Sequence, residues 1–131
     1  DVNGHVNNLE YLRWMQEVAT AHSSAHGWTM ERYHETQTSW VVRSHHIDYL
    51  RPAFAGETIS LLTWIADIQD IASTRKYLFW RPANNQVLAK AETLWVFVNG
   101  ATGRPGRIPD EFKTAFEVVG EDEDVLQAVR A

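Results

Sequence analysis

Apolar and polar residues repeat with two different periods along this chain, and the change of period separates a helical part from a strand-rich part. Apolar side chains recur at helical spacing after Asn7, which predicts a helix from about Asn8 to His26. Asn7 and Glu10 have the spacing of a capping box, and Gly27 favours a stop. Because apolar residues cover more than half of its circumference, this helix should be wrapped by other structure.

Residues that favour strands dominate after Thr38. Four strands are predicted, at Ser39–Leu50, Thr58–Ile68, Ser73–Arg81 and Val87–Asn99. Strict alternation in the first places Trp40, Val42, Ser44, His46, Asp48 and Leu50 on one face, opposite Val41, Arg43, His45, Ile47 and Tyr49. The pattern predicts an α+β fold in which an antiparallel sheet of about five strands curls around the helix, with the first strand expected before Asp1.

Shorter segments complete the predicted organisation. A helical turn is expected at Met30–His34, and a short helix at Asp110–Phe116. The acidic run that follows Gly120 indicates a solvated tail over about residues 117–131. With 131 residues, the chain fits a single domain over residues 1–131.

Composition narrows the classes of function. The formal net charge is -5 and the twelve Lys and Arg residues are scattered, so we expect no nucleic-acid partner. No apolar run reaches the roughly 18 residues of a membrane helix, and we expect a cytoplasmic protein without membrane contact. The absence of Cys excludes disulfides and thiol nucleophiles. Because residue 1 is not Met, we expect that a preceding segment has been removed or left out.

Candidate chemistry gathers just before the long helix. Asp1, Asn3 and His5 are polar side chains in a predicted loop, and the helix that follows has free backbone N–H groups at its start. Such N–H groups stabilise developing negative charge. The sequence therefore places an acid, an amide and a histidine at the positive end of a helix dipole.

Three motifs in series resemble the hotdog-fold acyl-CoA thioesterases of the 4-hydroxybenzoyl-CoA thioesterase type. They are Asp1-x-x-Gly4-His5-Val6-Asn7-Asn8-x-x-Tyr11-Leu12-x-Trp14, then Ile47-Asp48-Tyr49-Leu50-Arg51-Pro52-Ala53 with Gly56-Glu57, and finally Arg107-Ile108-Pro109-x-Glu111-Phe112. The resemblance covers nearly the whole chain. It implies a hotdog fold, an edge-to-edge homodimer or a homotetramer, and an acyl-CoA or acyl-carrier thioester as substrate, with no cofactor.

The resemblance also assigns roles. Asp1 would attack the thioester or activate water, and backbone N–H groups between Gly4 and Tyr11 would polarise the carbonyl. The Asp1-x-Asn3-x-His5 pattern is similar to that of plant-type acyl-ACP thioesterases, which adds Asn3 and His5. Some bacterial relatives have a His where this chain has Asn8. The predicted catalytic residues are thus Asp1, Asn3, Gly4, His5 and Asn8, and the predicted substrate-binding residues are Tyr11, Arg75 and Lys76.

Plainer roles compete with these assignments. Asp1 could be a turn residue, His5 could be structural, and Arg75 and Lys76, chosen as contacts for CoA phosphates, could be ordinary solvated cations. Trp40, Trp64, Trp80 and Trp95, one in each predicted strand, could line an acyl pocket or fill the core. His22 and His26 have a spacing that can bind zinc, but no third ligand is apparent, so we predict no metal.

Three functional classes remain at this point. The leading hypothesis is hydrolysis of an acyl thioester to free acid and thiol. A hotdog-fold hydratase also uses an Asp and a His, but its Asp-x-Asn-Pro-x-x-His pattern differs from Asp1-Val2-Asn3-Gly4-His5. A non-catalytic acyl-CoA-binding module would not need an acid aimed at the thioester.

Overall fold

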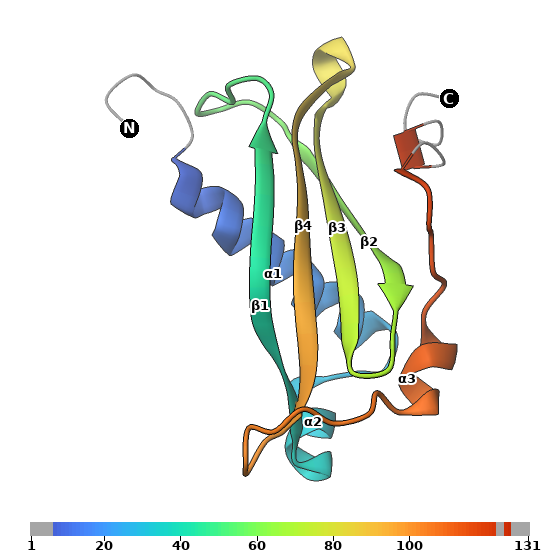
Figure 1. The fold of residues 1–131 in the computed structure, drawn as a ribbon. Helices are drawn as coiled ribbons and strands as arrows, with labels where there is room; N and C mark the ends of the chain where they lie inside the picture. The colour runs from blue at the N-terminus through green and yellow to red at the C-terminus, as the bar shows by residue number, and fades with distance from the viewer. Residues whose placement is uncertain (1–6, 123–124, 127–131) are drawn as a thin grey trace.

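The computed structural model describes residues 7–122, 125 and 126. It contains helices α1 (Asn8–Ala25), α2 (Met30–Thr36) and α3 (Asp110–Ala115), the short 3-10 turn η1 (Pro82–Asn84), and strands β1 (Thr38–Tyr49), β2 (Ser60–Ile68), β3 (Ala72–Arg81) and β4 (Gln86–Asn99) (Figure 1). The strands form one antiparallel sheet in the order β1-β4-β3-β2. The α+β class and the antiparallel sheet are confirmed, while the strand expected before Asp1 lies outside the described residues.

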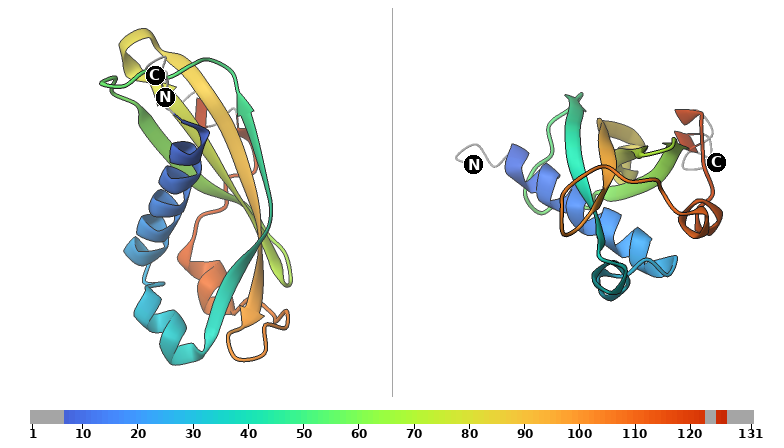
Figure 2. Two further views of the ribbon diagram at one scale, coloured as in Figure 1. Left: turned by 90° about the vertical axis from the view of Figure 1, so that its left-hand side faces the viewer. Right: turned by 60° about the horizontal axis from the view of Figure 1, so that its bottom comes forward.

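Helix α1 lies across one face of the curved sheet (Figure 2). Its N-cap is Asn7, whose Oδ1 accepts a hydrogen bond from the Leu9 N–H at 2.8 Å. Glu10 does not complete the reciprocal half of the expected capping box, because its carboxylate pairs with Arg13. Gly27 follows the helix with φ +87°, a left-handed conformation that disfavours other residues.

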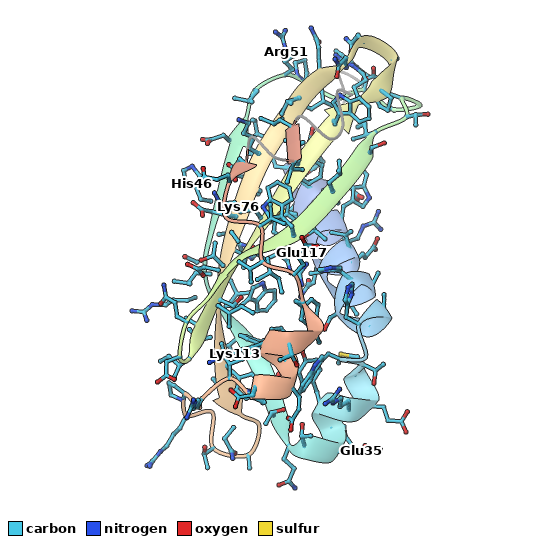
Figure 3. All side chains as sticks on the ribbon, turned by 90° about the vertical axis from the view of Figure 1, so that its right-hand side faces the viewer. Glu35, His46, Arg51, Lys76, Lys113 and Glu117 are labelled. Atoms are coloured by element: carbon cyan, nitrogen blue, oxygen red, sulfur yellow. The ribbon has the colours of Figure 1, made fainter. Side chains whose placement is uncertain are left out.

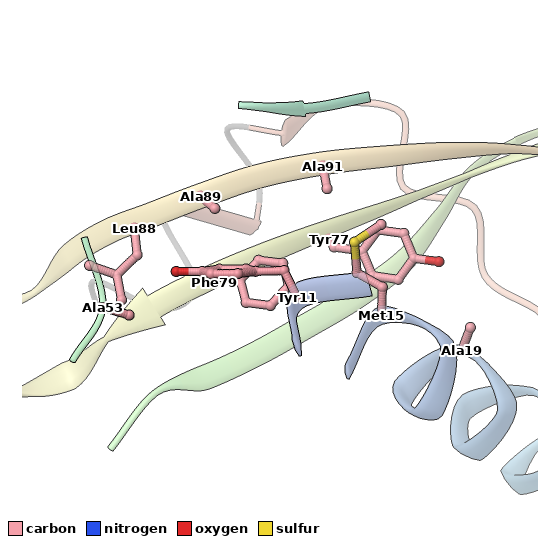
Figure 4. Close-up of a cluster of buried hydrophobic side chains, with 9 residues drawn as sticks. All are labelled: Tyr11, Met15, Ala19, Ala53, Tyr77, Phe79, Leu88, Ala89 and Ala91. Carbon is pink, nitrogen blue, oxygen red and sulfur yellow. The ribbon is translucent and has the colours of Figure 1, made fainter. Parts of the chain in front are cut away.

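The packing between α1 and the sheet forms the main apolar core of the domain (Figure 4). Tyr11 and Met15 of α1 are 2% and 1% exposed, and they belong to one buried cluster with Tyr77 and Phe79 of β3. Alanines at 89 and 91 of β4 share the cluster. The small side chains of β4 leave room for the bulky side chains of α1 and β3 between the helix and the sheet. The long helix is thereby held by the sheet along its first half.

Three irregularities in strand pairing correct the simple alternation expected from the sequence. The register of β1 shifts between Val42 and Ser44, where Arg43 is an extra residue opposite β4. Trp40 and Val42 consequently share the helix-facing side of β1 with His45, Ile47 and Tyr49. The strict alternation predicted for this strand was wrong at the bulge. Similar shifts occur in β2 between Ile65 and Asp67 and in the pairing of β3 with β4 next to Leu88.

Part of the described C-terminal segment, where the sequence predicts a solvated tail, packs against the sheet. The Val119 N–H donates to the Ile65 carbonyl at 2.9 Å, and Lys76 pairs with Asp122 at 3.0 Å. Leu126 is 7% exposed and packs with Trp64 and Leu78 on the outer face of the sheet. Figure 3 shows this segment passing near Lys76. Both an acidic residue, Asp122, and an apolar one, Leu126, thus contact the sheet.

Candidate active site at α1 and its adjoining cavity

The N-terminal end of α1 directly follows most of the residues that the sequence predicts to be catalytic. Asn8 is the first helical residue and is exposed. The Glu10 N–H donates to the Asn7 carbonyl at 3.0 Å, and the Asn7 side chain takes the Leu9 N–H. No acceptor for the Asn8 N–H lies among the described residues. The helix start thus retains a backbone donor, while the predicted catalytic residues Asp1, Asn3, Gly4 and His5 lie outside the described residues.

Tyr11, predicted to contact substrate, lies in the core one turn into α1. Its ring centroid is 4.7 Å from that of Phe79 and 5.2 Å from that of Tyr49. Burial raises the pKa of the Tyr11 hydroxyl, and the nearby Tyr49 and Glu57 raise it further. The side chain is therefore a neutral, largely enclosed part of the wall between α1 and the sheet. Its contact with substrate stays a prediction.

The structure separates Arg75 and Lys76, which the sequence grouped as cations for CoA phosphates. The two residues point to opposite faces of β3, as expected for neighbours in a strand. Lys76 is on the outer face, where it pairs with Asp122. Arg75 is on the helix-facing side and only 6% exposed. These two cations therefore do not form one cluster.

A cavity of about 300 Å³ adjoins Arg75 beside the C-terminal half of α1. Its walls are largely aromatic and include Trp28, Tyr33, Trp40, Trp95 and Phe112. Gln16, Thr20 and Ser23 of α1 add polar side chains to the lining. Of the four tryptophans that sequence analysis placed in strands, Trp40 and Trp95 thus line the cavity, while Trp64 packs in the outer cluster and Trp80 bonds Asn85 at 2.9 Å.

Several residues of this cavity carry contacts that hold its shape. Tyr33 accepts a hydrogen bond from Trp40 Nε1 at 2.9 Å. The Arg32 guanidinium lies 3.8 Å from the centroid of the Trp28 ring. Trp28 itself is 2% exposed, and none of residues 7–122, 125 and 126 accepts a hydrogen bond from its Nε1. Sequence reasoning did not single out Trp28 or Tyr33, because their polar, mixed segment has no regular apolar period.

His22 links α1 to Arg75. Arg75 Nη1 lies 2.9 Å from His22 Nδ1 and 3.0 Å from Thr63 Oγ1. Burial lowers the pKa of His22 to about 4, with further lowering by Arg75 and His26. At neutral pH the ring is therefore uncharged, and Nδ1 can accept a hydrogen bond from Arg75 Nη1. His22 and His26 have a spacing that can bind zinc, but both rings pack against the ring of Phe116.

Neither a metal cluster nor a membrane helix marks the described part of the chain. No group of three or more His, Asp or Glu side chains there is arranged to hold a metal ion. None of the helices described at residues 7–122, 125 and 126 is long and apolar enough to cross a bilayer.

Comparison with known proteins identifies the family. The family defined as the thioesterase-like superfamily matches residues 1–116, and the chain belongs to it. A palmitoyl-acyl carrier protein thioesterase from Cuphea hookeriana is 28% identical over 113 residues, which cover 81% of this chain and 27% of the relative. The chain spans between 18% and 30% of the length of the curated relatives that it matches.

Solved structures confirm the hotdog fold. A 1,4-dihydroxy-2-naphthoyl-CoA thioesterase from Synechocystis aligns with a TM-score of 0.79 and 19% identity, covering 88% of this chain and 85% of that one. A Staphylococcus aureus protein solved in complex with CoA aligns with a TM-score of 0.83 and 16% identity, covering 95% and 83% of the two chains. At these identities the likeness concerns the fold.

Proposed function

We propose that this domain hydrolyses an acyl-CoA or acyl-carrier thioester to a free acid and a thiol. The observation that carries the proposal is the start of α1, where the Asn8 N–H has no acceptor among residues 7–122, 125 and 126, in a chain of the thioesterase-like superfamily. A backbone donor at a positive helix end is suited to the oxyanion that forms when a thioester carbonyl is attacked. Asp1 is the acid that the sequence places before this helix, in the motif that resembles the thioesterases.

Two routes are chemically consistent with this arrangement. In the first, an Asp1 carboxylate oxygen attacks the carbonyl carbon, the thiolate leaves, and water hydrolyses the resulting anhydride. In the second, Asp1 removes a proton from water, whose oxygen attacks the carbonyl directly, and the thiolate leaves with a proton. Hydroxylamine added during turnover would convert Asp1 to a hydroxamate, detectable by peptide mass spectrometry, only along the first route.

The proposed activity is tested by thiol release from a panel of acyl-CoA and acyl-carrier thioesters, using the full-length protein that contains this domain. The Asp1→Asn variant should lose most of the activity. Asp70→Asn, which changes an exposed acid in the turn between β2 and β3, is the matched control and should keep it. Absence of hydrolysis with every thioester would refute the enzyme assignment, and water addition to an enoyl-CoA instead would favour the hydratase.

We also propose that the domain works as a homo-oligomer. Strand β1 is at an edge of the sheet and exposes Val41, Val42 and Tyr49 by 47%, 39% and 45%. Exposed apolar residues on an unpaired strand edge favour association with another chain. Light scattering coupled to gel filtration should give a multiple of the monomer mass. Val41→Lys should shift this mass toward the monomer, and a wild-type monomer at micromolar concentration would contradict the proposal.

A further inference from the structure

Arg75 presents a buried positive charge for which the described residues supply no counter-ion. Within the described part of the chain, its guanidinium bonds only to His22 Nδ1 and Thr63 Oγ1, and neither of these partners is anionic. No carboxylate of the described chain forms a salt bridge with it. A buried charge of this kind is costly unless an anion pairs with it. Burial accordingly lowers the pKa of Arg75.

Trp28, which lines the same cavity as Arg75, also carries a donor in need of an acceptor. Its buried Nε1 has no hydrogen-bond partner among the described residues. The rings of Tyr33, Trp40 and Trp95 are also part of the lining. An aromatic enclosure with a few strong donors is typical of sites that bind an apolar ligand with one polar or anionic group.

We propose that this cavity receives the far end of an acyl group that carries a terminal carboxylate, which pairs with Arg75. The inference rests on the function proposed above and specifies the substrate class of that site. Guanidinium nitrogens match the two oxygens of a carboxylate, and methylene groups pack well against aromatic walls. The substrate is then the monothioester of a dicarboxylic acid.

The position of the cavity along α1 sets the length of this acyl group. Leu9, Leu12, Gln16 and Thr20 lie on one side of the helix, and the last two line the cavity. Leu9 and Leu12 are 71% and 37% exposed, so an apolar chain can lie along this side. From Asn8 to Gln16 the helix rises by roughly 12 Å. Because an extended alkyl chain advances by about 1.25 Å per carbon–carbon bond, an acyl chain needs roughly ten bonds to reach the cavity.

Coenzyme A is the other anion that Arg75 could bind, because its phosphates also pair with guanidinium groups. The enclosed position of Arg75 and the cavity volume of about 300 Å³ favour a slender chain over a nucleotide. The test therefore includes CoA alone as a competitor, and displacement of the acyl ligand by CoA would refute the assignment of the cavity.

The proposal is tested by binding, without turnover, in the full-length protein. The two probes are monomethyl decanedioate, which has a terminal carboxylate, and methyl decanoate, which has none. Intrinsic tryptophan fluorescence reports binding, since Trp28, Trp40 and Trp95 line the cavity. The carboxylated ester should bind on the order of ten- to a hundred-fold more tightly, as expected for a charge-assisted pair. Equal affinities for the two esters would overturn the inference.

Three variants assign the preference to its residue. Arg75→Met, which keeps the volume, should abolish the preference, and Arg75→Lys should keep part of it. Lys90→Met removes a cation from the opposite face of the sheet and should leave the preference intact. A preference for the carboxylated ester that survives in Arg75→Met would refute the role of Arg75. If that variant does not fold, equal affinities of the two esters for the wild type would still refute the inference.

Binding and hydrolysis can fail separately. Thiol release without any preference for carboxylated acyl groups would refute this inference alone. A carboxylate preference without hydrolysis of any thioester would refute the proposed function and leave a binding site of this specificity.

Discussion

The two ends of α1 differ in what they offer a substrate. The N-terminal end is polar and carries a backbone donor next to the loop that contains Asp1. The C-terminal half adjoins an aromatic cavity in which the only charged wall residue, Arg75, lacks a counter-ion among the residues that the structure describes. Under the two proposals made above, reaction and recognition are divided along one helix. A single rigid element can set the distance between the thioester and the far end of its acyl chain.

The strongest test of this division compares the two ends in one assay. Asp1→Asn should lower the rate of thiol release by roughly a hundred- to ten-thousand-fold for carboxylated and neutral acyl groups alike, because it removes a general base or nucleophile. Arg75→Met should change mainly the ratio between the two substrate classes. Steady-state kinetics on decanedioyl-CoA and decanoyl-CoA measure both. If Asp1→Asn altered the ratio instead of the rate, the division of roles would be wrong.

The core between the two ends should dominate stability. Phe79 is fully buried beneath Tyr11, so Phe79→Ala should cost about 3–5 kcal/mol of unfolding free energy. Urea denaturation followed by circular dichroism gives this value. Ala83→Gly, in the exposed turn η1, is a control that should cost far less. A loss below about 1 kcal/mol at Phe79 would mean that this contact between α1 and the sheet is weaker than the structure indicates.

The N-terminal end of α1 should depend on its cap. Asn7→Ala removes the acceptor for the Leu9 N–H and should destabilise the protein by about 1 kcal/mol. Asn7→Asp replaces the amide oxygen by a carboxylate oxygen that accepts from the same donor and should retain most of the stability. Thermal melting distinguishes the two variants. Equal melting temperatures for Asn7→Ala and the wild type would show that the cap contributes nothing measurable.

The C-terminal half should instead show a dependence on pH. The pKa of folded His22 is about 4, below the ordinary 6.5, so the unfolded chain takes up this proton first as the pH falls. The stability from neutral His22 is complete above about pH 6.5 and is lost toward pH 4. Arg75 and His26 both disfavour the proton.

The variant His22→Asn keeps an acceptor for Arg75 but does not titrate. Between pH 7 and pH 4.5, the melting temperature of this variant should fall by a few degrees less than that of the wild type. The expected difference is modest because the His22 ring is half-buried. His34→Asn, on the exposed side of α2, is the control and should follow the wild type. Identical pH profiles for all three proteins would remove His22 from this account.

Sequence reasoning reached the fold because its evidence is local and repeated. The helical period after Asn7 and the runs of strand-forming residues gave α1 and the four strands to within about two residues at each end. The alternation within β1 failed at Arg43, because a bulge depends on pairing with β4 rather than on the strand's own residues.

The cavity shows the limit of that reasoning. From the sequence, Arg75 is one cation among several. Its neutral partners, His22 and Thr63, are distant in sequence, so the sequence does not show that its charge lacks a counter-ion. Trp28 lies in a segment without a regular period. The segment from Asp1 to His5 differs from the cavity in this respect. Its residue types alone indicate catalytic chemistry, and its assignment stays a prediction.

The bulge at Arg43 also bears on which strands can pair with the β1 edge of the sheet. Strand β1 leaves a long backbone edge open, and the extra residue divides that edge into two segments of different register. A regular strand adding to this edge can match one segment but loses hydrogen-bond alignment at the other. An added strand with a complementary irregularity can pair along the whole length. The edge therefore discriminates against the repetitive stacking of flat strands that builds fibrils.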